Sequence, residues 1–116
     1  MEYLDPMIDL QTLGLDAFRR NAGEASRLLK ALSNEHRLMI LCRLGAGEVQ
    51  VSRLQDDIGL SQSALSQHLA RLRDDGLVAA RREGVSIFYR IADPAAVRVI
   101  AVLADIYCPP ESPSES

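Results

Sequence analysis

The clearest hydrophobic periodicity in the chain predicts two short helices joined by a tight turn. Leu54 and Ile58 lie four residues apart, so a helix over Val51–Ile58 would bury one side. Gly59 ends this helix, because glycine readily adopts the left-handed backbone found just past a helix end. Ser61 then supplies a hydroxyl that can cap the next helix. The pattern is typical of a helix-turn-helix.

The second of these helices, expected from Gln62 to Asp75, has one apolar and one polar side. At about 100° per residue, three leucines fall on one side and predict core positions: Leu65, Leu69 and Leu72. A helix that enters the DNA major groove needs short side chains near its N-terminus and groups that bond base edges. The candidates are Gln62, Ser63, Ser66 and Gln67, with Arg71 on the flank. A merely solvated polar face is the alternative interpretation.

Beyond this helix the apolar period shortens from about 3.6 residues to about 2, which predicts a β-hairpin. Its strands are expected over Leu77–Arg82 and Val85–Ile91, with Glu83 and Gly84 between them. The apolar residues that share one side are Ile87, Tyr89 and Ile91. The hairpin also carries three arginines, Arg81, Arg82 and Arg90. Such a charged wing beside a reading helix suits contact with phosphates or the minor groove.

Three further helices are predicted around this unit. The first, over Leu15–Leu32, has an apolar seam formed by Phe18, Ala22, Ala25, Leu29 and Leu32. The second runs from Glu35 to about Leu44 after a cap at Ser33 or Asn34, with Leu38, Leu41 and Cys42 facing inward.

The last helix is expected from an Asp93 cap and Pro94 to Tyr107. It is apolar nearly all round, so it must be covered on more than one side. A twin subunit is the most economical second cover, which predicts a two-fold homodimer. Its two reading helices would then meet successive major grooves of an inverted-repeat operator in double-stranded DNA.

Composition sets the limits of the fold. The chain has 116 residues, 47% of them hydrophobic, which suits one mainly α domain with a small β-hairpin: a winged helix-turn-helix of five or six helices. We expect residues 15–108 to form it, with 1–14 an N-terminal extension and 109–116 a disordered Pro/Ser/Glu-rich tail. The acidic N-terminus resembles no secretory signal, so a cytoplasmic protein without membrane contact is expected.

The charge of the chain is unevenly distributed. The formal net charge is −3, although residues 61–90 hold five arginines against three acidic residues, 5 − 3 = +2. Positive charge therefore gathers where the reading helix and wing are predicted. Few cations per subunit can displace counterions, so DNA binding should depend on salt with a modest slope.

Several segments together resemble the ArsR family of winged-helix transcriptional repressors. These are LSNEHRLMIL at Leu32–Leu41, LSQSALSQHL at Leu60–Leu69, Gly76-Leu77-Val78, Arg82-Glu83-Gly84 and Phe88-Tyr89, and the resemblance covers about residues 15 to 108. It implies a DNA-binding repressor. No enzymatic function and no cofactor are predicted, because the chain has no Cys-x-x-Cys motif, no phosphate loop and no nucleophile with an arranged base.

Metal sensing is well known in this family, but its ligand patterns are missing here. Residues 47–51 take the place where arsenic and cadmium sensors hold cysteines, and they contain no thiol. The last helix contains no histidine for a zinc or nickel site. His36 and His68 have no further soft ligand nearby in sequence, and a tetrahedral site needs three or four ligands. We therefore predict structural roles for both histidines and no metal site.

Two cysteines remain as candidate sensing residues, Cys42 late in the second helix and Cys108 at the end of the last. They could be inert buried thiols. Within the family, however, this placement resembles the persulfide-responsive branch, the SqrR, BigR and HlyU type. The resemblance implies that reactive sulfur species induce release of DNA by joining the two thiols through sulfur.

Thiol chemistry makes such a switch plausible. One thiolate attacks a sulfane sulfur and the other thiol resolves the product. Cys108, at a helix C-terminus whose partial negative charge should raise its pKa, is expected to be the resolving partner. A plain disulfide needs Cα atoms about 4.4 to 6.8 Å apart, whereas a bridge with extra sulfurs spans more. A metal-responsive repressor, a peroxide sensor and a winged-helix protein-interaction module stay open as alternatives.

Overall fold

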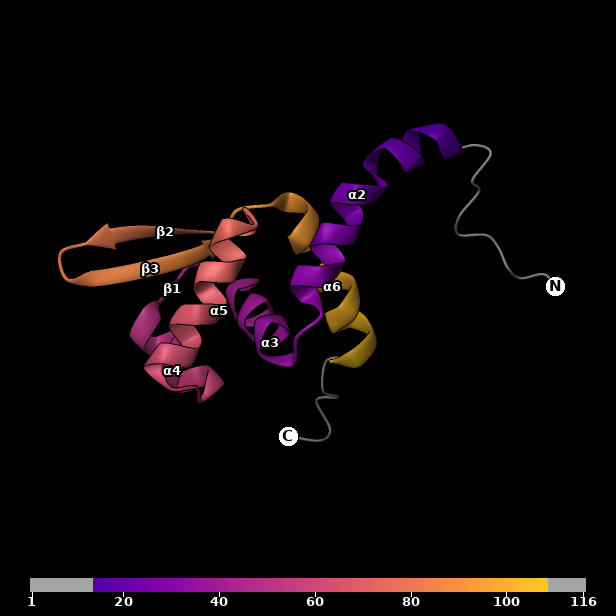
Figure 1. The fold of residues 1–116 in the computed structure, drawn as a ribbon. Coiled ribbons are helices and arrows are strands. Elements are labelled where there is room, and N and C mark those ends of the chain that lie inside the picture. The colour runs from indigo at the N-terminus through magenta and orange to yellow at the C-terminus, as the bar shows by residue number, and fades with distance from the viewer. Residues whose placement is uncertain (1–13, 109–116) are drawn as a thin grey trace, which may run out of the picture.

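The computed structural model describes residues 14–108, so the predicted N-terminal extension up to residue 13 and the predicted tail lie outside the described residues. Within these described residues, five helices and three strands follow in order (Figure 1). They are α2 (Leu15–Leu32), α3 (Glu35–Leu44), β1 (Val49–Gln50), α4 (Val51–Ile58), α5 (Gln62–Asp74), β2 (Val78–Glu83), β3 (Ser86–Ile91) and α6 (Pro94–Tyr107). The winged helix-turn-helix predicted from the sequence is confirmed, and every predicted helix ends within one residue of its observed end.

The wing differs from its prediction in two details. Its turn is Gly84-Val85 and not Glu83-Gly84, because Gly84 supplies the positive φ of 63° and Glu83 still pairs with Ser86. The sheet also has a third strand, in the order β1-β3-β2. In this antiparallel strand Val49 pairs with Tyr89. Two residues are too few to show alternation, so periodicity did not predict β1.

The core lies where α3, α4 and α5 pack together beneath the sheet. Leu65, Leu69 and Leu72 are buried as predicted. In α3, however, Ile40, Leu41 and Leu44 form the buried side. Cys42 was predicted to face inward, and this is wrong: its side chain is exposed, because it lies about 100° round the helix from Leu41.

The helix-turn-helix turn is fixed by local hydrogen bonds and by one glycine. Gly59 has a φ of 80° and ends α4 in the left-handed conformation. The Ser61 Oγ then accepts a hydrogen bond of 3.2 Å from the Ala64 backbone N–H. Asn34 and Asp93 cap α3 and α6 in the same way, accepting at 3.0 Å and 2.8 Å. The angle between α4 and α5 is therefore defined by the sequence of the turn itself.

Large apolar side chains remain exposed on α2 and α6, which lie away from the wing (Figure 1). On α2 these are Leu15, Phe18 and Leu29, and on α6 they are Val97, Val102, Ile106 and Tyr107. Of the predicted α2 seam, Leu32 packs in the core of its own subunit. Within residues 14–108 no helix combines the length and apolar character that a bilayer crossing requires.

His36 of α3 and His68 of α5 lie beside each other, with ring centroids 5.6 Å apart. Burial lowers the pKa of His68, and the positive charges of Arg37 and His36 lower it further. The folded domain therefore favours the neutral form of His68.

This pKa shift predicts a loss of stability in mild acid. Because the pKa of His68 is lower in the folded than in the unfolded chain, the unfolded chain takes up the proton first as pH falls. The stabilisation is complete above the unfolded value of about 6.5 and declines below it. We expect the urea midpoint to fall between about pH 7.5 and pH 5.5, and to fall less in His68→Gln. An equal pH dependence in the two proteins would contradict the assignment.

Candidate DNA interface and thiol pair

The first two turns of α5 present the polar side chains that the sequence singled out. Gln62, Ser63, Ser66 and Gln67 are all exposed. Ser63 lies 3.5 Å from the Ser61 hydroxyl, and within residues 14–108 the other three side chains form no hydrogen bond. Because Leu65 and Leu69 hold the opposite side in the core, these groups face outward with their donors and acceptors available.

The arginines predicted to contact DNA are in different states. Arg71 forms an ion pair with Asp75, with Nε and Oδ2 3.0 Å apart. Arg82 and Arg90 are exposed and form no ion pair within the part of the chain that the structure describes. An arginine already paired with a carboxylate must exchange that partner before it contacts a phosphate. The unpaired arginines of the wing therefore have the lower cost of binding DNA.

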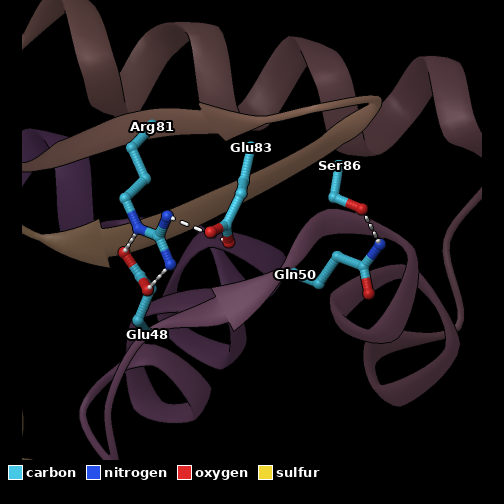
Figure 2. Close-up of polar contacts among 5 residues, drawn as sticks. All are labelled: Glu48, Gln50, Arg81, Glu83 and Ser86. Carbon is cyan, nitrogen blue, oxygen red and sulfur yellow. Dashed lines mark hydrogen bonds and ion pairs between the residues drawn. The ribbon is translucent and has the colours of Figure 1, made fainter.

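Arg81 is the most strongly held of the predicted contacts (Figure 2). Its Nε and Nη2 donate to the two carboxylate oxygens of Glu48, at 2.8 and 2.9 Å, and its Nη1 donates to Glu83 at 3.3 Å. The guanidinium also lies 4.6 Å from the ring centroid of Phe88. The hydrogen bonding between Arg81 and Glu48 lowers the pKa of the Glu48 carboxyl group and raises the pKa of the Arg81 guanidinium.

These contacts join the start of the helix-turn-helix to the wing. Beside them, Gln50 Nε2 donates to the Ser86 hydroxyl at 3.0 Å (Figure 2). Glu48 and Gln50 lie just before α4, and their partners lie on β2 and β3. Glu48 could not be predicted from the sequence, because its partner is 33 residues away and no local pattern links them.

Arg73, in the last turn of α5, was not among the arginines predicted to contact DNA. Its Nη1 donates to the Tyr89 hydroxyl at 3.0 Å. The helical periodicity did not predict that Arg73 faces outward, because it lies next to the buried Leu72 and four residues from the buried Leu69. Its partner on β3 is brought close only when the wing folds back along α5.

Both cysteines carry free, exposed thiols: Cys42 lies on α3, and Cys108 is the C-cap residue of α6. Cys42 lines a cavity of about 190 Å³ together with Gly45 and α6, from which Val97, Ile100, Ala101 and Ala104 contribute. Cys108 lies one turn beyond Ala104 and donates its backbone N–H to the Ala104 carbonyl at 2.7 Å. It is thus the C-cap residue of α6.

The electrostatics of this pair concern Cys42 in particular. Burial raises the pKa of the Cys42 thiol, and the charge of a Cys108 thiolate raises it further. Arg43, the nearest cation in sequence, is held by Asp57 of α4 with Nε and Oδ2 2.6 Å apart. These directions do not favour Cys42 as the first attacking thiolate. The order of attack predicted from the helix end at Cys108 stays a prediction.

Potential metal ligands are scattered over the described residues. Within residues 14–108, no three side chains among His, Cys, Asp and Glu lie together so as to hold a metal ion. Glu48, in the segment where family metal sensors hold cysteines, binds Arg81 instead.

Comparisons with known proteins place this architecture in a family. Residues 34–80 match the family described as bacterial regulatory protein, arsR family. The biofilm growth-associated repressor of Agrobacterium fabrum is 41% identical over 108 residues, covering 93% of this chain and 92% of that protein. The transcriptional activator HlyU of Vibrio cholerae is 43% identical over 103 residues, covering 89% and 95%.

Solved structures agree with this assignment. Reduced HlyU from Vibrio cholerae matches with a TM-score of 0.77 at 45% identity, over 80% of this chain and 98% of that chain. The transcriptional repressor BigR from Xylella fastidiosa matches with a TM-score of 0.77 at 39% identity, over 82% and 97%. The chain therefore belongs to the arsR family of bacterial regulatory proteins, as a winged helix-turn-helix transcriptional regulator.

Proposed function

We propose that this protein is a sequence-specific repressor that senses persulfide or polysulfide through Cys42 and Cys108 and then releases its operator. The observation that carries the proposal is that Cys42 lies where α3 meets α6, close enough to Cys108 at the end of α6 for a Cys108 thiolate to raise the pKa of the Cys42 thiol. The same helix α3 packs against α5, which carries the polar reading face. A covalent change at the thiols thus acts on an element in direct contact with the reading helix.

In this proposal α5 lies in the major groove. Gln62, Ser63, Ser66 and Gln67 contact base edges, for which exposed Ser and Gln groups near a helix N-terminus are suited. Arg82 on the wing contacts the phosphate backbone. Arg71 and Arg81 contribute less than predicted from the sequence, because phosphates must first displace Asp75 and Glu48.

The exposed apolar residues of α2 and α6 support a homodimer. Val102, Ile106 and Phe18 are each more than half exposed in the single subunit, at 58%, 59% and 54%. Burying such residues against a second copy is favourable by about 25 cal/mol per Å² of apolar surface. A two-fold dimer places two copies of α5 on one side of the DNA, so the operator is an inverted repeat.

The sulfur chemistry balances without an external oxidant beyond the persulfide. Each cysteine thiolate attacks the outer sulfur of RSSH, forming a protein persulfide and releasing RSH. One protein persulfide then attacks the cysteine sulfur of the other, giving a three-sulfur bridge and hydrogen sulfide. Overall, two RSSH and two thiols yield two RSH, one hydrogen sulfide and the bridge. Each further RSSH lengthens the bridge by one sulfur and leaves RSH.

The names of the relatives support a role in transcriptional regulation. One is named a repressor and another an activator, and one solved structure is described as reduced HlyU. A bridge from α3 to the end of α6 would constrain the packing of α3 between the reading helix and the dimer helix. A coupling of about 1 to 3 kcal/mol between the thiol pair and DNA is sufficient for a switch.

The thiol proposal predicts a defined product. After treatment with glutathione persulfide, intact mass and peptide mapping should show Cys42 linked to Cys108 through at least one added sulfur. DNA affinity should fall about 5- to 150-fold, while Cys42→Ser and Cys108→Ser keep their affinity under the same treatment. A simple disulfide formed equally well by peroxide would indicate a peroxide sensor. Unchanged affinity of the bridged protein would contradict the proposal.

The reading helix predicts a specificity residue. Gln67→Ala should reduce discrimination between a selected operator and variants of its half-sites by about 1 to 3 kcal/mol, because alanine cannot form the bidentate bond to a base. Competition titrations measure this difference, and binding to unrelated duplex DNA should change little. Full retention of specificity in a normally folded variant would remove Gln67 from the reading surface.

The dimer proposal predicts a separable defect. Val102→Glu should shift the protein toward monomer in analytical ultracentrifugation and weaken binding to the inverted repeat, because it places a charge in the buried interface. Val85→Glu is the matched control for sedimentation alone, since Val85 is 96% exposed and lies at the tip of the wing, which the proposal places on DNA. If Val102→Glu sediments like Val85→Glu and like the parent protein, the α6 interface is wrong.

A further inference from the structure

A groove runs between α4, α5 and β3, and we call it the wing groove. Its volume is about 450 Å³. Its polar lining comes from Ser52, Gln55, Gln62, Ser66 and Arg73, and its apolar lining includes Leu65, Leu69 and Tyr89. Two of these polar residues, Gln62 and Ser66, are also candidates for base contacts, so the groove borders the reading face directly.

Arg73 brings an uncompensated positive charge to this groove. Its Nη1 donates to the Tyr89 hydroxyl at 3.0 Å, and Tyr89 is only 7% exposed. A neutral phenol fixes the guanidinium without cancelling its charge, and the remaining N–H groups stay available. Within residues 14–108 Arg73 forms no ion pair, whereas Arg71 and Arg81 are each held by carboxylates.

The start of α4 offers a second group of donors. The helix begins at Val51, which lines the groove together with Ser52. Its N-cap residue, Gln50, makes no capping hydrogen bond, because its side chain donates to Ser86 instead. The first backbone N–H groups of α4 therefore lack a side-chain acceptor from the cap residue, and a helix N-terminus in this state favours an anion.

The geometry of duplex DNA indicates which part of it would lie in the wing groove. The major and minor grooves are separated by a sugar–phosphate strand. A protein that inserts α5 into the major groove and its wing toward the adjacent minor groove must straddle that strand. The space between α5 and β3 is the wing groove, and its cation, hydroxyls and amides match phosphate oxygens.

We propose that the wing groove holds the DNA sugar–phosphate strand that separates the two grooves, with Arg73 as its principal phosphate contact. Tyr89 acts as a positioning residue that aims the Arg73 guanidinium, while Ser52 supplies a neutral hydrogen bond. This inference rests on the proposed function, because it requires α5 to lie in the major groove. The charge distribution along the sequence counts all five arginines between residues 61 and 90 alike, whereas this inference gives Arg73 a role of its own.

The test measures how binding depends on salt. Fluorescence anisotropy with one labelled duplex, selected from genomic fragments by the parent protein, gives the slope of log K against log salt between about 50 and 200 mM KCl. Arg73→Gln should reduce the magnitude of this slope by about 0.9 for each phosphate that is no longer neutralised, or about 1.8 for a two-fold dimer. Arg73→Lys should keep most of the slope, because it keeps the charge.

Two control variants separate charge from structure. Tyr89→Phe should weaken binding several-fold with the slope unchanged, since the charge remains but is no longer held in position. Arg19→Gln removes the same charge from α2, away from the wing (Figure 1), and should leave the slope as in the parent.

The possible results are distinct. If Arg73→Gln retains the parent slope and a normal thermal melting curve, or if Arg19→Gln lowers the slope equally, the wing groove proposal is wrong. Failure of the parent protein to select any DNA would instead overturn the proposed function.

Discussion

The packing of α3 is the constraint on which the rest of this domain depends. Helix α3 contacts α2, α4, α5, α6 and β3, and its Ile40 and Leu41 are completely buried. Such residues make many close contacts, so a shift of α3 would disturb the packing of every element that it contacts. The ion pair from Arg43 to Asp57 further ties the end of α3 to α4. The positions of the reading helix α5, the wing and the terminal helix α6 therefore all depend on α3.

Carboxylates then determine which arginines remain available. Five arginines lie between residues 61 and 90, but Arg71 is paired with Asp75, and Arg81 with Glu48 and Glu83. Arg73, Arg82 and Arg90 are left without such partners within residues 14–108. Because nonspecific affinity follows the number of available cations, this arrangement limits binding to arbitrary DNA. Under the proposed function, a protein with a net charge of −3 would then depend more on base contacts for its affinity.

The sequence predicted the helices well because their signals are local. The leucine spacing in α5, the glycine at position 59 and the caps at Asn34, Ser61 and Asp93 each act within a few residues. The exposed positions on α5 followed from the same periodicity. The residues missed all depend on distant partners: β1 exists only because β3 lies beside it, Glu48 is held by Arg81, and Arg73 is fixed by Tyr89. Cys42 was wrongly expected to be buried, because the apolar spacing of α3 did not show that Ile40 and Leu44, and not Cys42, share the buried side with Leu41.

The positions of the two proposed sites explain how sulfur chemistry at one end of the core can reach DNA at the other. The thiol pair lies between α3 and α6, and the wing groove lies between α4, α5 and β3. Leu65 and Leu69 line that groove and are also part of the core that includes Ile40 and Leu41 of α3. The proposed bridge, which would hold α3 against the end of α6, would therefore act on side chains that line the proposed phosphate site. In the proposed homodimer it would also act on the separation of the two reading helices. Because a close-packed interior has low compressibility and transmits strain, a displacement of α3 by the proposed bridge would be passed on to both.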